Sequence, residues 1–259
     1  MKIYEPKGRA REYSPLALNY FKGCTHNCSY CYVNRLNAAF GTGANQYEAA
    51  APTDAGFREL ELSAKKFQGC NQQILLSFTG DPYCDMPSES TRRVLQILNR
   101  YNHKVAILTK GGNRVLNDID LFKQFGNRIK IGATLTFDND KDSLEWEPGA
   151  TLPGERIESL RKLSELGIKT WASFEPVIKP AQSLNLLYKV STFMDHVRVG
   201  KLNDYKGLDK HIDWTKFIHD TVNVCRKTGL KFYIKNDLAA FNKGTILFPK
   251  ERNSEYLNL

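Results

Sequence analysis

The sequence predicts an α/β fold, a partial (β/α)6 TIM-like barrel, and three observations point to it. Short β-rich runs alternate with longer amphipathic runs along the chain, which is the pattern of a parallel sheet covered by helices. Six such strand–helix units can be recognised, fewer than the eight of a closed barrel. The chain has 259 residues, of which 41% are hydrophobic, enough for one sizeable core. We therefore expect an open barrel with its reactive groups at the carboxyl ends of the strands.

The expected strands are short apolar runs. The first, residues 16–21, ends at Lys22 and Gly23 and leads into a cysteine-rich loop that continues through residue 47. The second ends at a turn that contains Gly80 and Pro82. The second to sixth expected strands cover residues 73–79, 104–109, 128–136, 168–174 and 196–199, and residues 230–234 form another β-rich run.

The expected helices carry apolar side chains at helical spacing. Phe57, Leu60 and Ala64 share one face of the first helix, and Gly167 and Gly229 end two later helices as C-terminal caps. The segment 137–153 is rich in Asp, Glu and Pro and is expected to be a loop. Helices are expected at residues 55–67, 88–101, 115–125, 155–166, 183–194 and 214–228.

The chain is expected to form a single domain, residues 1–259, with a core at about 16–203 and a C-terminal extension at 204–259. No apolar run approaches the roughly 18 residues that a membrane span needs. The N-terminus has no apolar segment like that of a signal peptide. Three of the six cysteines are crowded into one loop, which is not typical of a disulfide framework. These features predict a cytoplasmic protein without a membrane association.

The charge predicts anionic partners. The formal net charge is +9 and the pI about 9.2, which favours polyanions, with nucleic acid first and anionic cofactors second. The basic residues are spread along the chain, so a solvated basic surface is the alternative interpretation. Candidates for phosphate contacts are Arg9, Arg11, Lys250 and Arg252.

Cys24, Cys28 and Cys31 form a C-x3-C-x2-C pattern within eight residues. Thiolates are soft ligands, and three of them on one loop leave the fourth position of a tetrahedral or cubane site open. The pattern is compatible with a 4Fe–4S cluster that has one free iron, with a Cys3His zinc site completed by His26, or with three unrelated cysteines. The nearby aromatic residues favour the cluster, because they would shield it from water.

These residues resemble the radical S-adenosylmethionine (SAM) superfamily, and in particular its spore photoproduct lyase-like branch. The resemblance is carried by the cysteine pattern and by residues 5–19 and 23–32, EPKGRAREYSPLALN and GCTHNCSYCY. It implies a 4Fe–4S cluster on Cys24, Cys28 and Cys31 whose free iron binds SAM. It also implies that one electron from the cluster cleaves SAM to a 5′-deoxyadenosyl radical, which abstracts hydrogen from a substrate. The (β/α)6 barrel is the fold of this superfamily.

The resemblance also implies residues that bind SAM at the strand ends. The turn Thr79, Gly80 and Asp81 after the second strand matches the turn that holds the SAM amino group. Lys110, at the end of the third strand, matches a lysine that pairs with the SAM carboxylate. An ordinary turn and a surface lysine are the alternatives that the residues alone leave open.

Further candidates follow the fourth and fifth strands. Strand alternation places Thr134 and Thr136 on one side, so both hydroxyls are expected to point into the barrel near the ribose. Arg156 matches the lyase-like pattern and is a candidate for the SAM carboxylate or a substrate phosphate. Ser173 and Glu175 are candidates for ribose and adenine contacts.

Catalysis in the lyases uses a cysteine as hydrogen donor, with tyrosines beside the last cluster cysteine. Tyr30 and Tyr32 match those tyrosines by position, and Cys84 is the candidate donor because it follows the SAM-binding turn. The favoured substrate is DNA, RNA or a nucleotide, and the expected reductant is an external flavodoxin or ferredoxin. A peptide or small metabolite as substrate, and a zinc-dependent nucleic-acid-binding protein, are the alternatives.

Overall fold

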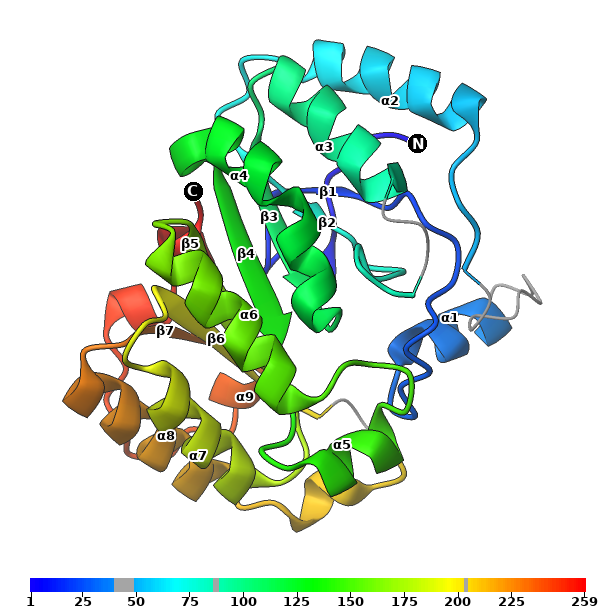
Figure 1. Cartoon of the computed structure of the whole chain (residues 1–259). Helices are drawn as coiled ribbons and strands as arrows, with labels where there is room; N and C mark the ends of the chain where they lie inside the picture. The colour runs from blue at the N-terminus through cyan, green and yellow to red at the C-terminus, as the bar shows by residue number, and fades with distance from the viewer. Residues whose placement is uncertain (40–48, 86–88, 203–204) are drawn as a thin grey trace.

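The computed structural model describes residues 1–39, 49–85, 89–202 and 205–259. Its centre is one sheet of seven parallel strands that follow one another in sequence order (Figure 1). The strands are β1 (Leu16–Leu18), β2 (Gln73–Leu76), β3 (Lys104–Thr109), β4 (Ile129–Thr134), β5 (Lys169–Val177), β6 (His196–Lys201) and β7 (Lys231–Ile234).

The predicted partial barrel is confirmed and gains a strand. All six expected strands are present, and the β-rich run near residue 230 is β7, which pairs with β6. The segment expected as a C-terminal extension therefore continues the barrel wall. The register keeps neighbouring carboxyl ends together; for example, Leu108 pairs with Gly132, and Gly132 with Trp171.

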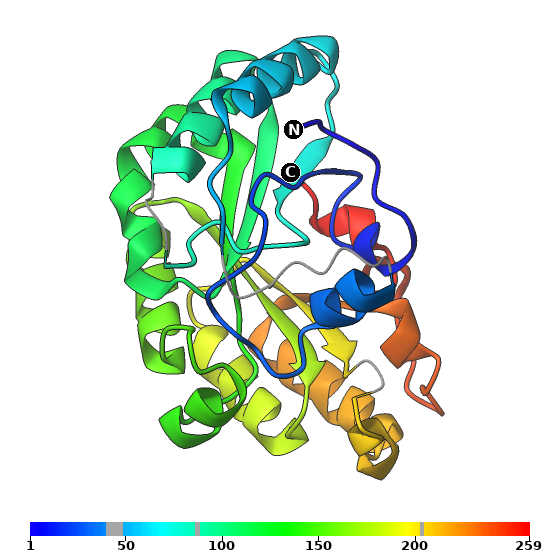
Figure 2. The same ribbon diagram turned by 90° about the vertical axis from the view of Figure 1, so that its right-hand side faces the viewer.

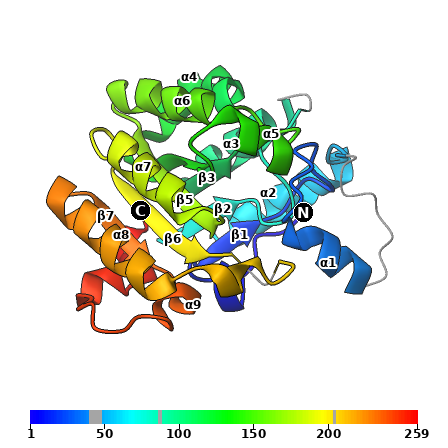
Figure 3. The same ribbon diagram turned by 90° about the horizontal axis from the view of Figure 1, so that it is seen from below.

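Helices cover the outer face of the sheet, as the view onto the carboxyl ends of the strands shows (Figure 3). Thr53 caps α2 by accepting a hydrogen bond from the Gly56 amide at 3.2 Å, and Gly229 ends α8 in the left-handed conformation. The covering helices are α2 (Asp54–Lys66), α3 (Glu89–Arg100), α4 (Ile119–Phe125), α6 (Pro153–Glu165), α7 (Pro180–Val190) and α8 (Trp214–Thr228).

Several expected boundaries were wrong. A 3-10 helix, Gly112–Asp118, occupies the first turn of the helix expected at 115–125. The two expected loops contain α1 (Tyr32–Ala39) and α5 (Asp140–Trp146), both at the carboxyl end of the sheet (Figure 1). A short helix, α9 (Asn236–Ala239), follows β7. Residue 88, the expected start of α3, lies outside the described residues.

The inside of the barrel holds a small apolar layer of Leu75, Ala106 and Trp171. Trp171 is buried, and its indole Nε1 donates to the Ile107 carbonyl at 3.0 Å. Gly132 on β4 makes room for this ring, because a Cβ there would lie 2.4 Å from it. The layer separates the floor of the barrel from its mouth.

Buried cations form the floor, at the amino ends of the strands. Lys130 donates to the Leu257 carbonyl at 2.6 Å, and Arg198 donates to the Ser254 carbonyl at 3.0 Å. His196 stacks on Trp171, and burial, with these two cations, lowers the pKa of His196 well below its usual value. The C-terminal segment therefore closes this end with carbonyl oxygens.

The gap between β1 and β7 is closed by side chains of the N-terminal segment. The Glu12 carboxylate accepts from the Tyr233 hydroxyl at 2.6 Å and from the Asn236 amide at 2.8 Å. Figure 2 shows this segment, in blue, next to the red C-terminal segment, where Arg11 lies 3.9 Å from Glu255. We call this line of contacts the seam.

None of the helices in the described parts of the chain combines the length and the hydropathy that a bilayer span requires.

Candidate functional site

A cavity of about 220 Å³ opens at the carboxyl ends of the strands. It brings together residues from the cysteine loop, from the loops after β2, β3 and β6, and from the carboxyl ends of β4 and β5. Of the predicted site residues, the cavity is lined by Cys24, Cys28, Cys31, Tyr30, Tyr32, Thr79, Gly80, Asp81, Lys110, Thr134, Ser173 and Glu175. Thr136, Arg156 and Cys84 do not line it.

The cysteine loop follows β1 and presents three free thiols to this cavity. A turn closed by the Cys31 amide and the Cys28 carbonyl, 3.0 Å apart, brings the last two cysteines close. Cys28 is buried and the other two are partly exposed. Burial raises the pKa of Cys28 to about 12, while the Lys110 ammonium opposes the shift.

The donors fit an iron–sulfur cluster by their chemistry, because three soft thiol ligands from one loop line one cavity. Their sulfurs do not yet converge: among the described residues, no three His, Cys, Asp or Glu side chains form a ready-made metal site. The Cys24 thiol instead interacts with that of Cys84. Cys84 is thus a buried neighbour of Cys24, and it does not line the cavity that it was expected to serve.

The loop after β4 holds the cysteine loop from one side. The Gly149 amide donates to the His26 carbonyl at 2.9 Å, and the Ser29 amide donates to the Trp146 carbonyl at 2.9 Å. Gly149 is needed for this approach, since a Cβ there would lie 2.1 Å from the Thr25 carbonyl oxygen. Main-chain contacts therefore hold the cysteine loop on the side of the loop after β4.

The turn after β2 packs against the same loop. A Cβ on Gly80 would lie 2.9 Å from the Gly23 carbonyl oxygen, so the two loops meet at van der Waals distance only because Gly80 has none. The Tyr32 hydroxyl donates to the Phe78 carbonyl at 2.5 Å, and the Phe78 amide donates to Asn19 at 2.8 Å. Tyr32 thus joins the start of α1 to this turn.

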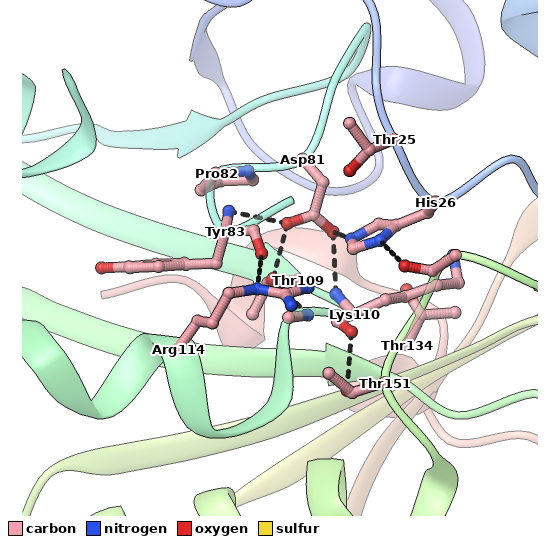
Figure 4. A network of polar contacts seen from close by, with 12 residues as sticks. Thr25, His26, Asp81, Pro82, Tyr83, Thr109, Lys110, Arg114, Thr134 and Thr151 are labelled. Atoms are coloured by element: carbon pink, nitrogen blue, oxygen red, sulfur yellow. Dashed lines mark hydrogen bonds and ion pairs between the residues drawn. The ribbon is translucent and has the colours of Figure 1, made fainter. Parts of the chain in front are cut away.

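Asp81 is at the centre of a polar network that joins three loops (Figure 4). Its carboxylate accepts from the Tyr83 amide at 2.8 Å, the Thr109 hydroxyl at 2.6 Å and the Lys110 amide at 2.7 Å. The His26 Nε2 lies 3.0 Å from it. Burial favours the neutral acid, but His26 and these hydrogen bonds outweigh it and lower the pKa of Asp81 below its usual range.

Lys110 places a buried cation in the cavity. Its side chain is 15% exposed, and its Nζ lies over the Tyr30 ring at 5.6 Å and 4.0 Å from Glu147. Burial lowers the pKa of Lys110, but the nearby Cys28 and Glu147 outweigh it and the pKa is raised. Lys110 is therefore charged at neutral pH.

Glu147 and Arg156 form a buried ion pair at 2.6 Å, and neither side chain is more than 1% exposed. The Glu147 carboxylate also accepts from the Thr136 hydroxyl at 3.1 Å and from the Tyr30 hydroxyl. Burial raises the pKa of Glu147, but Arg156 and Lys110 outweigh it and lower the pKa, so this carboxylate is ionised.

Two expectations need correction here. Thr134 and Thr136 were expected to point into the barrel together, but β4 ends at Thr134, so the alternation does not continue and only Thr134 reaches the cavity. The Arg156 guanidinium, expected at the cofactor, donates instead to Glu147 and to the Thr151 and Thr134 carbonyls. Arg156 is thus 1% exposed and directs three of its N–H groups to partners within the protein.

Two residues that the sequence analysis did not identify hold Glu175: Tyr13, which lines the cavity, and Lys235, which does not. Tyr13, from the N-terminal segment, lies 2.7 Å from the Ser173 hydroxyl and donates to Glu175 at 2.5 Å. Lys235, at the end of β7, donates to Glu175 at 2.5 Å and is buried. A lysine directly after a β-rich run was the available signal for Lys235, since Lys110 follows β3 in the same way.

The zinc alternative is not supported by the geometry of His26. Its Nδ1 lies 3.1 Å from the Gly149 carbonyl oxygen, and its Nε2 faces Asp81. Both ring nitrogens thus face protein oxygens, so the ring is not presented as a fourth ligand beside the thiols.

Fold and site together define a class of enzyme, one that binds a small cofactor at the open end of a parallel barrel, beside a loop with three thiols. The sequence matches the family model of the Radical SAM superfamily over residues 18–184, and the chain belongs to this superfamily. Membership of this superfamily implies a 4Fe–4S cluster and SAM as cofactors. The predicted resemblance is confirmed.

Two curated relatives are themselves uncharacterized. The protein ORF301 of Acidianus two-tailed virus is 26% identical over 170 residues, which is 63% of this chain and 56% of that protein. The protein MJ0683 of Methanocaldococcus jannaschii is 28% identical over 163 residues, 62% of this chain and 60% of that protein. The matched region thus spans little more than half the length of these relatives.

Solved structures agree on the fold. A spore photoproduct lyase variant with bound SAM and dinucleoside spore photoproduct has a TM-score of 0.67 at 14% identity, covering 90% of this chain and 78% of the lyase chain. Streptococcus suis SuiB bound to SAM has a TM-score of 0.63 at 16% identity, covering 90% of this chain and 53% of SuiB. SuiB bound to the precursor peptide SuiA matches equally well, with a TM-score of 0.63.

Proposed function

We propose that this enzyme holds a 4Fe–4S cluster on Cys24, Cys28 and Cys31 and uses it to cleave SAM. The observation that carries the proposal is the meeting of these three thiols with Lys110 and the turn after β2 around one cavity. When bound, the cluster supplies the electron that cleaves SAM, and the 5′-deoxyadenosyl radical so released abstracts hydrogen from the substrate. An external flavodoxin or ferredoxin is the proposed source of that electron.

The chain's own residues bind and orient the cofactor. Lys110 is a charged, mostly buried cation that suits the SAM carboxylate. The turn at Thr79 and Gly80 borders the same cavity and offers backbone groups for the SAM amino group. Thr134 and Ser173, which line the opposite side, suit the ribose hydroxyls.

Aromatic side chains form part of the lining of the site. The cavity is bordered by Tyr13, Tyr30, Tyr32 and Phe78, and the three tyrosine hydroxyls are held by protein acceptors. Their rings are therefore fixed, and they shield the space beside the thiols. A dry and rigid surrounding protects a reactive radical from side reactions.

The proposed substrate is DNA, RNA or a nucleotide. Two observations support it: the net charge of +9, and the likeness to spore photoproduct lyase with its bound dinucleoside. Arg9 is 55% exposed and lies 3.7 Å from Asp237, a residue of α9, which follows β7. It is therefore kept as a candidate for phosphate contacts. Arg11 is tied to the Pro15 carbonyl at 2.6 Å.

A peptide substrate is the second candidate. The observation that favours it is the likeness to SuiB with its bound precursor peptide, at a TM-score of 0.63. Affinity for single-stranded DNA, RNA and short peptides, measured across salt concentrations, separates the two. A steep fall of affinity with salt for nucleic acid alone supports the first candidate. Salt-independent binding of peptides alone supports the second.

SAM cleavage tests the core of the proposal. Anaerobically reconstituted protein, given dithionite and SAM, is expected to produce 5′-deoxyadenosine. Replacement of Cys24, Cys28 or Cys31 by Ala is expected to abolish the product. Cys70→Ala is the matched control, because this free thiol lies outside the cavity. Wild-type protein that binds iron and sulfide yet forms no 5′-deoxyadenosine would contradict the proposal.

A further inference from the structure

Asp81 was expected to bind SAM, but its carboxylate has no free hydrogen-bonding capacity toward the cavity. Oδ1 accepts from the Tyr83 amide and the Thr109 hydroxyl, and Oδ2 accepts from the Lys110 amide and faces His26. The side chain is only 11% exposed. A carboxylate that accepts from three donors and has an imidazole nitrogen 3.0 Å away gains little from a further donor.

What Asp81 does hold is the backbone of Lys110. The Lys110 amide donates to Asp81 at 2.7 Å, and the Lys110 carbonyl accepts from the Thr151 hydroxyl at 2.8 Å and from the Thr151 amide at 3.1 Å (Figure 4). Both peptide groups beside the Lys110 Cα are therefore fixed. The direction in which the ammonium enters the cavity follows from this fixed base.

His26 connects this fixed base to the cysteine loop. It lies between the first two cysteines of the loop and is 2% exposed. One ring nitrogen reaches Asp81 at 3.0 Å, and the other reaches the Gly149 carbonyl at 3.1 Å. The imidazole thus spans the space between the loop after β2 and the loop after β4, with the cysteine loop between them.

We propose that Asp81 and His26 are positioning residues that set the distance and orientation of the cysteine loop relative to Lys110. Neither contacts SAM; each acts through the other and through the loops that it holds. The inference rests on the proposed function, because the two ends that the pair aligns are the cluster ligands and the SAM carboxylate site. It replaces the direct cofactor role expected of Asp81.

Two conservative replacements of His26 separate its two contacts. A glutamine amide reaches as far from the Cα as histidine Nε2 and retains a donor toward Asp81. An asparagine amide reaches only as far as Nδ1, so it retains a donor toward the Gly149 carbonyl and loses Asp81. We therefore expect His26→Asn to behave like Asp81→Asn, and His26→Gln to behave like the wild type.

The first measurement uses metal-free protein. Alkylation rates of each cysteine, mapped by mass spectrometry, are expected to rise about tenfold at Cys24, Cys28 and Cys31 in His26→Asn and in Asp81→Asn, because the loop is released. Cys225, which is fully buried in the core, is expected to stay protected and reports on global unfolding. If Cys225 becomes reactive in one of these two variants, that variant has unfolded, and the alkylation rates of the other variant decide on the proposal. Unchanged rates in a folded variant, or equal rates in the Gln and Asn variants, overturn the proposal.

The second measurement uses reconstituted protein. Iron content is expected to stay near that of the wild type, while SAM affinity by equilibrium dialysis falls about tenfold in His26→Asn, in Asp81→Asn and in the double variant alike. A large loss in Asp81→Asn with none in His26→Asn would mean that Asp81 touches SAM, which refutes the inference. Wild-type protein that takes up no cluster refutes the proposed function, and the alkylation result then still decides on the pair.

Discussion

Replacement of Glu147 by Gln tests whether the site depends on the buried ion pair beneath Lys110. The substitution keeps the shape of the side chain and removes its charge. Arg156, which is 1% exposed, would then face only neutral oxygens: the Thr151 and Thr134 carbonyls at 2.7 and 3.1 Å and, at most, the oxygen of the new amide. An uncompensated buried cation is the expected consequence.

The magnitude follows from the burial of both partners. Breaking a buried ion pair by removing one partner costs about 3–5 kcal/mol. That is a large share of the roughly 5–15 kcal/mol by which folded domains are stable. For a chain of this size it corresponds to a fall in Tm of roughly 10 °C. The hydrogen bonds from Thr136 and Tyr30 add to the cost where the amide turns its nitrogen toward them.

The assay is urea unfolding of metal-free protein, followed by circular dichroism. Arg156→Met alone is expected to cost somewhat less than Glu147→Gln, because the Lys110 ammonium, 4.0 Å from Glu147, still partly compensates the carboxylate. The double variant is expected to regain part of the loss, since neither member of the pair is then charged and only Lys110, which is 15% exposed, loses its partner. Glu145→Gln is the matched control: this neighbouring side chain is exposed, so its loss should stay within about 0.5 kcal/mol.

Two results would refute this reasoning. A cost below about 1 kcal/mol for Glu147→Gln would mean that the pair is solvated or rearranged. Additive losses in the double variant would mean that Glu147 and Arg156 do not act on each other. SAM affinity adds a further check on Arg156: if Arg156→Met weakens SAM binding more than Lys110→Met does, the guanidinium serves the cofactor directly.

Three further outcomes are expected. Burial lowers the pKa of His196, so below pH 7 the unfolded chain binds a proton that the folded chain does not. The free energy of unfolding should therefore fall by about 2 kcal/mol as the pH is lowered from 7.5 to 5.0. His196→Gln should flatten this part of the pH profile measured by urea unfolding. Gly149→Ala should cost about 2 kcal/mol by pushing the cysteine loop away, whereas Gly154→Ala, with nothing within 4 Å of the new Cβ, should not destabilise. Lys235→Met leaves Glu175 without its cation and should cost about 2–3 kcal/mol in thermal unfolding, a loss that Glu175→Gln in the same chain should reduce.

The strands and the cysteine loop could be predicted from the sequence because their signals are local. A strand such as β4 is a short apolar run, and the three cysteines lie within eight residues of each other. The helix α5 was missed because its residues are mostly polar and charged. A local signal was present: Asn139 is an N-cap that accepts from the Asp142 amide at 3.0 Å, ahead of an acidic first turn.

The contacts between distant segments could not be predicted in this way. Tyr13 reaches Ser173 across 160 positions, and Arg156 finds Glu147 only because the loop after β4 folds back over the barrel. Position relative to a strand end identified Asp81 but did not show what it binds. Its partners come from three loops, so its role follows from the tertiary structure.

The seam gives the barrel one line along which it is not a continuous sheet. Six strand pairings run from β1 to β7, but Glu12 joins the N-terminal segment to the last strand through single side-chain contacts. Hydrogen bonds of this kind contribute about 1 kcal/mol each, far less than a cooperative ladder. Along this line the wall is therefore held by side chains and by the two terminal segments, and its stability there depends on individual residues such as Glu12 more than on any strand pairing.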